Sequence, residues 1–180
     1  MVKNNKGFTL VELLIAISIF ASLSIVISGI YLAFSKSQAR IKASQSLLND
    51  TQYILETISK EIQNNQIDYG NDYPNDCGSS YCQITLIKEN GDKSNFTYSD
   101  KVIKYYIKLH NQESWNSISL NNILDFEITY FNIYLTPLAL SENEQPRVTI
   151  SMEVENTSEW EIEEIFYKLQ NTISSRVYKR

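Results

Sequence analysis

The sequence predicts an α+β protein in which one long N-terminal helix, transmembrane at first and then amphipathic, packs against an antiparallel β-sheet head. Three observations predict this class. Residues 13–34 form an uncharged run, apolar residues then recur at helical spacing as far as Ile62, and after Gln66 the apolar pattern changes to a period of two. Helix and sheet each have an apolar side to bury, so we expect them to pack on each other.

The uncharged run is long enough to cross a membrane. Its 22 residues would form a helix of about 33 Å, against a hydrocarbon core of roughly 30 Å. Basic residues flank the run on both sides, so their distribution does not assign an orientation.

The same helix is predicted to continue through residues 35–65 as an amphipathic half. No proline interrupts residues 8–65, which would form one helix of about 87 Å. Gly29 is the interior weak point, a place to bend or a place for close helix packing. The stripe to be buried consists of Leu47, Leu48, Ile54, Leu55, Ile58 and Ile62.

Residues 66–180 are predicted to form a single β-rich domain. Turn-forming residues end the helix, and Asn90-Gly91-Asp92 is a hairpin signal. The segment 161–177 is ambiguous and is interpreted as one strand or a pair of strands. The remaining strands are expected at 83–88, 96–98, 102–109, 123–134 and 148–154.

One carboxylate, Glu12, lies at the edge of the uncharged run. At the centre of a membrane it would cost about 2.5–3.5 kcal/mol, and somewhat less near the end of the span. Such a residue calls for a cation at the same depth, and in a low dielectric that pairing would fix the axial register of neighbouring chains. The alternative is a carboxylate that extends to the lipid headgroups.

The segment Lys6-Gly7-Phe8-Thr9-Leu10-Val11-Glu12 resembles the class III signal of type IV pilins and type II secretion pseudopilins. The resemblance implies that residues 1–7 are a leader, that a prepilin peptidase cuts between Gly7 and Phe8, and that the new Phe8 amine is N-methylated. Glu12 is then the fifth mature residue and pairs with the amine of another subunit. The cut precedes the apolar core, so residues 8–34 stay on the mature chain as the transmembrane half of the helix.

The resemblance also implies partners and location. The partners are other pilin or pseudopilin subunits, contacted through the N-terminal helix, together with the prepilin peptidase, the pilus assembly platform and the membrane. The chain would be a single-pass cytoplasmic (inner) membrane protein with an extracytoplasmic head, and part of a pilus or pseudopilus after assembly.

Looser matches favour a minor subunit that initiates or tips the filament. Residues 19–21, 55–63 and 169–176 resemble J-type pseudopilins and W-type minor pilins, whereas K-type pseudopilins typically lack the glutamate. Two alternatives stay open: a pilin head that is adhesive or binds DNA or an exoprotein, and an unrelated signal-anchored membrane protein.

Cys77 and Cys82 are expected to form a disulfide, because the head would be exported and the cysteine count is even. Free thiols are the alternative. A zinc site with His110 is disfavoured because these residues leave the ligand set incomplete. No metal and no cofactor is expected.

Acidic residues suggest two further sites, each with a simpler reading. Asp68, Asp72 and Asp76 recur every fourth residue but do not fit an EF-hand, so a solvated loop is favoured over calcium. The glutamates around Trp160 indicate a charged edge that discourages strand addition, with a partner surface as the alternative. They are Glu159, Glu161, Glu163 and Glu164.

No enzyme is predicted, because the sequence contains no phosphate loop, nucleophile elbow or metal-ligand cluster. The net charge of −5 would become −7 when Lys3 and Lys6 leave with the leader. A chain of this charge is not expected to bind nucleic acid.

Overall fold

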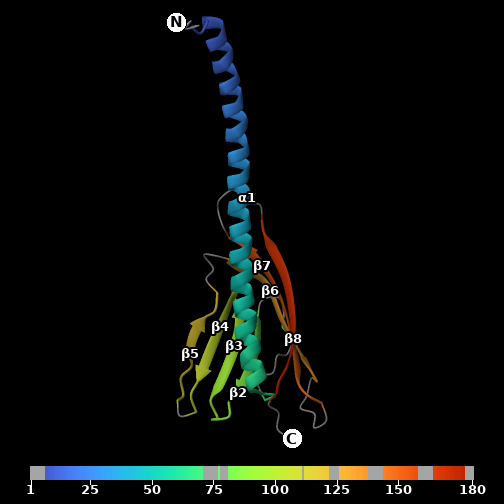
Figure 1. The fold of residues 1–180 in the computed structure, drawn as a ribbon. Coiled ribbons are helices and arrows are strands. Elements are labelled where there is room, and N and C mark those ends of the chain that lie inside the picture. Colours follow the sequence, from blue (N-terminus) through green and yellow to red (C-terminus); the bar gives the residue numbers. More distant parts are fainter. Residues whose placement is uncertain are drawn as a thin grey trace, which may run out of the picture. The chain divides into compact units, whose positions relative to one another are not determined.

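The computed structural model describes residues 7–70, 77, 81–110, 112–121, 126–137, 144–157 and 164–176. These residues form one helix and eight strands, which confirms the predicted α+β class (Figure 1). The chain divides into two compact units, Met1–Lys42 and Ala43–Arg180, and each is described by itself.

Helix α1 runs from Leu10 to Asn64 without interruption, close to the predicted bounds. Its first 33 residues belong to the N-terminal unit, where apolar side chains are exposed on all sides; Ile19 is 54% exposed and Phe20 73%. By length and composition this helix is able to cross a membrane. We call residues 10–34 the stem and the described residues of 43–176 the head.

The serine hydroxyls of the stem are satisfied within the helix. Ser22 donates to the carbonyl of Ser18, Ser24 to that of Phe20, and Ser28 to that of Ser24, at 2.8–2.9 Å. In hydrocarbon an unpaired hydroxyl would be costly, so these bonds suit the stem to an environment without water.

The strands of the head form two antiparallel sheets. One has the order β1-β2-β3-β4-β5 and the other the order β6-β7-β8. Antiparallel pairing was predicted, but the division into two sheets was not. The bounds are β1 Gln66–Ile67, β2 Tyr81–Ile87, β3 Lys93–Ser99, β4 Val102–Lys108, β5 Asn116–Ser119, β6 Phe126–Thr136, β7 Arg147–Asn156 and β8 Phe166–Ser174.

Most predicted strands are confirmed. The segments at 83–88, 96–98, 102–109, 123–134 and 148–154 correspond to β2, β3, β4, β6 and β7, and the Asn90-Gly91-Asp92 hairpin joins β2 to β3. The ambiguous C-terminal segment contributes one strand, β8. The sequence did not predict β1 or β5, because two residues are too few for a pattern and Asn-Ser-Ile-Ser has a single apolar residue.

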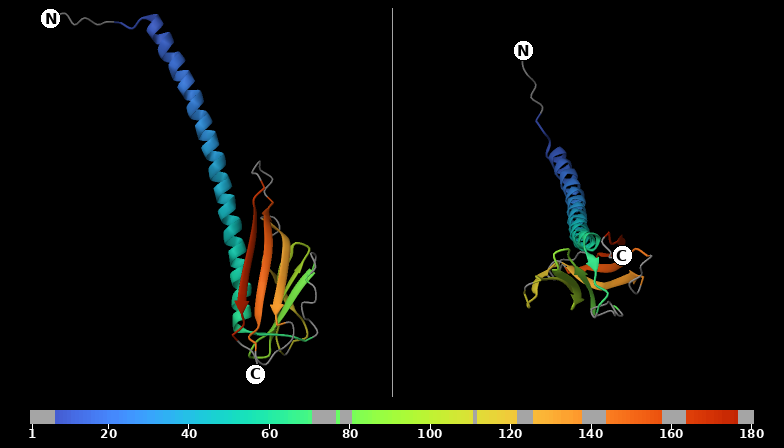
Figure 2. Two further views of the ribbon diagram at one scale, coloured as in Figure 1. Left: turned by 90° about the vertical axis from the view of Figure 1, so that its right-hand side faces the viewer. Right: turned by 90° about the horizontal axis from the view of Figure 1, so that it is seen from below.

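Both sheets pack against residues 43–64 of α1 (Figure 2). Ile54, Ile58 and Ile62 are completely buried, together with Phe96 of β3 and Phe131 of β6. The predicted stripe therefore faces the core, apart from Leu48, which is half-buried. Tyr98 of β3 joins the two sheets by donating its hydroxyl to the Ile128 carbonyl of β6 at 2.9 Å.

Candidate functional site

The peptide bond between Gly7 and Phe8 lies outside the helix. Residues 7–9 have no regular structure, and α1 begins at Leu10. Phe8 is 85% exposed, and a Cβ added to Gly7 would meet nothing within 4 Å. The bond is therefore accessible in an irregular segment, as a peptidase requires of a backbone that it must bind. The predicted leader residues 1–6 lie outside the described part of the chain.

Glu12 lies in the first turn of α1 and forms a capping box with Thr9. The Thr9 backbone N–H and hydroxyl both donate to Glu12 Oε2 at 3.0 Å, and the Glu12 N–H donates to Thr9 Oγ1 at 3.3 Å. This reciprocal pattern satisfies N–H groups that the start of a helix leaves unpaired, and it sets a carboxylate against the positive end of the helix dipole.

The role of Thr9 was not predicted from the sequence. The Thr-x-x-Glu spacing of Thr9 and Glu12 is the signature of a capping box and was available in the sequence. The structure thus adds an intrachain set of bonds for Glu12 beside the two readings that the sequence offered.

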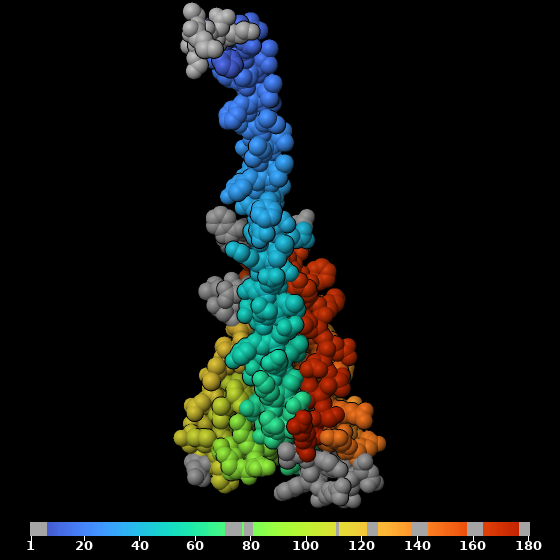
Figure 3. Space-filling model, viewed as in Figure 1, coloured from blue at the N-terminus to red at the C-terminus, as the bar shows by residue number. Residues whose placement is uncertain are grey.

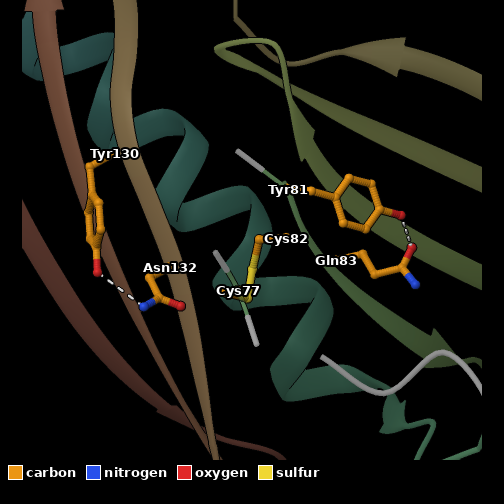
Figure 4. The surroundings of a disulfide bond; sticks show 6 residues. All are labelled: Cys77, Tyr81, Cys82, Gln83, Tyr130 and Asn132. Atoms are coloured by element: carbon orange, nitrogen blue, oxygen red, sulfur yellow. Dashed lines mark hydrogen bonds between the residues drawn. A yellow bond between two sulfur atoms is a disulfide. The ribbon is translucent and has the colours of Figure 1, made fainter. Parts of the chain in front are cut away.

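The predicted disulfide between Cys77 and Cys82 is confirmed, with Cα atoms 4.6 Å apart. Cys82 is the second residue of β2, pairs with Tyr98 of β3 and is buried in the core. Figure 4 shows the bond joining the start of β2 to the preceding segment. In the same view the Tyr81 hydroxyl bonds to Gln83 Oε1 at 2.6 Å.

Asp68, the first residue of the candidate calcium set, is bound to protein groups. Its Oδ2 lies 2.7 Å from Lys93 Nζ and its Oδ1 accepts the Gly70 N–H at 3.0 Å. Partial burial acts to raise the pKa of Asp68, but the bonds from Lys93 and Gly70 and the charge of Lys93 outweigh it and lower the pKa. Asp72 and Asp76 lie outside the described residues.

Within the described ranges no group of three or more His, Cys, Asp or Glu is placed to hold a metal ion. His110 follows β4, and its backbone N–H donates to Asp92 Oδ1 at 2.7 Å. Of the glutamates around Trp160, only Glu164 is described, and it is exposed.

Comparison with known proteins identifies the N-terminal segment. Residues 2–30 match the family model described as the prokaryotic N-terminal methylation motif, which is the signal of type IV pilins and pseudopilins. The long apolar helix fits this signal, and by length and composition it is able to anchor the chain in a membrane. No curated protein and no solved structure matches the chain.

Proposed function

We propose that this chain is a minor pilin or pseudopilin, a structural subunit without enzymatic activity that helps to initiate or tip a type IV pilus-like filament. The observation that carries the proposal is the methylation motif at residues 2–30. It coincides with an exposed, non-helical Gly7–Phe8 bond and with Glu12 in the first turn of a membrane-length helix.

The domain boundaries follow from this assignment. Residues 1–7 are the leader, 8–34 the transmembrane half of the helix, 35–65 its amphipathic half and 66–180 the β-rich globular domain. Cleavage leaves the apolar half on the mature chain, with the amino end on the cytoplasmic side and the head outside the membrane. The head then stays attached to the membrane until assembly withdraws the stem into a filament.

Glu12 acts as the register element of assembly. Removal of the leader creates a cationic amine at Phe8, which the transmembrane half of a neighbouring subunit can present to Glu12. Both bonds from Thr9 end on Oε2, so Oε1 is the oxygen available to that amine. Inside an apolar filament an unpaired carboxylate is costly, and a subunit docked out of register would be rejected.

Maturation is the first test. Mass spectrometry of the chain from cells with an active prepilin peptidase should show a product that begins at Phe8 and carries one methyl group on its amine. Replacing Gly7 by a bulky residue should leave the leader in place. A native chain that still begins at Met1 would refute the proposal and favour a plain signal anchor.

Substitution of Glu12 is the second test. Glu12→Gln and Glu12→Ala should insert into the membrane normally but reduce the filament yield. Asp50→Asn is the matched control, because Asp50 is an exposed carboxylate on the same helix whose Oδ2 accepts a bond from the nearby Ser46 hydroxyl at 3.4 Å. Wild-type filament yield from the Glu12 variants would refute the pairing.

The structural role is separated from a binding role by deletion. A strain that lacks the whole chain should make fewer filaments if the chain initiates assembly. A second strain keeps the stem but lacks the head. If that strain makes a normal number of filaments and loses only the retention of a ligand, the head has a binding function.

A further inference from the structure

The head has an open strand edge on each of two sides. β5 is one outer strand of the five-stranded sheet, whose other outer strand is the two-residue β1, and β8 is one outer strand of the three-stranded sheet, whose other outer strand is β6. Within the described residues neither β5 nor β8 has a second partner strand. Figure 1 shows them on opposite sides of the head. Natural proteins usually cover or interrupt such edges, because an open edge is a template for another strand.

The backbone pairing shows which groups of β8 point outward. The Asn156 N–H bonds to the Ile165 carbonyl at 3.1 Å and the Ser175 N–H to the Pro146 carbonyl at 3.0 Å. The backbone N–H and C=O groups of the odd-numbered residues of β8 therefore point toward β7. The N–H and C=O groups of the even-numbered residues therefore point away from the sheet. These residues are Phe166, Lys168, Gln170, Thr172 and Ser174.

A groove of about 450 Å³ lies between this edge and α1, lined by Gln52, Leu55, Glu56 and residues 168–171. Figure 3 shows β8, in red, alongside the helix. Leu55 and Leu169 supply the apolar part of the lining. The charges are already paired, Lys168 with Glu153 at 2.6 Å and Glu56 with Lys60 at 3.5 Å. The groove therefore suits an uncharged segment with one apolar side chain.

β5 has this chemistry. Its four residues, Asn116-Ser117-Ile118-Ser119, are all exposed and uncharged, and Ile118 is 59% exposed. The Leu120 N–H bonds to the Ile103 carbonyl at 2.9 Å, so Ile118 faces β4 through its backbone, while the backbones of Ser117 and Ser119 point outward. The Ile118 side chain lies on the sheet face that carries Tyr105, whose ring stacks on buried Phe96.

We propose that β5 of one copy of this chain adds to β8 of a second copy as an antiparallel strand, with Ser117 opposite Gln170 and Ile118 opposite Leu169. This register pairs outward backbone groups on both strands. It also places the Ile118 side chain on the face of the groove, against Leu169 and Leu55. The inference rests on the proposed filament function, because it requires heads to lie side by side.

Strand direction agrees with such an assembly. β8 runs in the direction of α1, because Tyr167 contacts Ser44 and Asn171 contacts Ser59. β2 also runs in the direction of α1, because Lys88, just after β2, pairs with Glu61 near the end of the helix. The sheet is antiparallel from β2 through β3 and β4 to β5, so β5 runs in the opposite direction to β2 and α1. Two copies with parallel helices thus present antiparallel edges. A pair joined in this way still has one free β5 and one free β8, so the contact is heterologous and does not close on itself.

Cysteine cross-linking of the full chain tests the proposal. Copies with Ser117→Cys and copies with Gln170→Cys, each carrying a different tag, are expressed together in filament-forming cells and oxidised with copper phenanthroline. A mixed-tag dimer is expected only when both substitutions are present. Thr136→Cys replaces Gln170→Cys in the control, because Thr136 is exposed on β6 rather than β8.

A second pair of variants tests the apolar contact. Ile118→Val should keep the mixed dimer and Ile118→Asp should abolish it, with the thermal unfolding of the head unchanged because Ile118 is exposed in the single chain. Equal cross-linking of the Thr136→Cys control, or a dimer insensitive to Ile118→Asp, would overturn the pairing.

The failure of this inference differs from the failure of the proposed function. A mature, methylated chain found in filaments without the mixed dimer, or cross-linked through Gln170→Cys only to another subunit, overturns the second-copy contact alone. A chain that keeps its leader overturns the filament function and, with it, this contact.

Discussion

The stem and the head use the same apolar residues in opposite ways along one helix. Ile19 in the stem is 54% exposed, whereas Ile58, in the same α1, is completely buried under two sheets. Exposed apolar surface on this scale is unfavourable in water and marks a membrane or assembly surface. The head buries its own apolar stripe, whereas the apolar side chains of the stem stay exposed in the single chain.

Their serines differ in a parallel manner. Ser24 and Ser28 of the stem donate to carbonyls one turn earlier in the same helix. In the head, Ser59 donates to the Leu55 carbonyl in the same way but also accepts a bond from Asn171 at 3.1 Å, and Ser44 contacts the Tyr167 hydroxyl, so both serines attach α1 to β8. The stem serines thus need no hydrogen-bond partner outside their own helix, whereas the head serines also connect the helix to the sheet.

The largest test of this contrast is a matched pair of truncations. Ile58→Ala should lower the free energy of unfolding of the head by about 2–5 kcal/mol, because it leaves a cavity in a closed core. Ile19→Ala should leave it unchanged. Denaturant unfolding of the detergent-solubilised chain, followed by tyrosine and tryptophan fluorescence, measures both. Equal losses would show that stem and head form one cooperative core.

The disulfide gives the next largest effect and acts only in the head. Replacing Cys77 and Cys82 by alanine should lower the free energy of unfolding by about 2 kcal/mol, the chain-entropy value for so short a loop. The loss of structure should be confined to the region around the disulfide, so the rate of hydrogen exchange in β7 should stay as slow as in the wild type. Global unfolding on addition of reductant would mean that the bond holds the two sheets together.

Sequence patterns predicted the parts of this molecule that depend on one element at a time. The uncharged run and the buried stripe gave the helix, and the period of two located five strands. Pairing depends on contacts between distant segments, so the two sheets and the short β5 could not be derived from periodicity.

The candidate site shows the same division. The residues Gly7, Phe8 and Glu12 are adjacent in sequence, so a local motif identified them. The bonds from Thr9 to Glu12 are also local, and the spacing for a capping box was present. The open β8 edge beside α1 joins segments more than 100 residues apart and was accessible only from the fold.

Substitution of one glycine in the head and one in the stem tests the same difference between the two regions, with smaller expected effects on stability. Gly91 has φ 85°, and a Cβ there would lie 3.0 Å from His110 Nδ1, so Gly91→Ala should destabilise the head by about 1–2 kcal/mol. A Cβ added to Gly29 would meet nothing within 4 Å. Gly29→Ala should therefore leave the free energy of unfolding of the head unchanged while it raises helix propensity in the stem. Hydrogen exchange near residue 29 and fluorescence unfolding of the head measure the two effects. Loss of head stability in Gly29→Ala would contradict the separation.

The smallest expected effect is a pH dependence confined to the head. The pKa of Asp68 is lowered in the folded chain, because the bonds from Lys93 and Gly70 and the charge of Lys93 outweigh the opposing effect of burial. A carboxyl with a depressed folded pKa stabilises the head above its unfolded pKa of about 3.9, and this stabilisation is lost as the pH falls through the lower folded value. Between pH 5 and pH 3, taken as about one unit on either side of that value, the melting temperature of Asp68→Asn should therefore fall less than that of the wild type. Glu56→Gln is the control, since the pair of Glu56 with Lys60 is exposed and contributes little. Parallel curves for Asp68→Asn and the wild type would show that the Asp68–Lys93 pair does not couple head stability to pH.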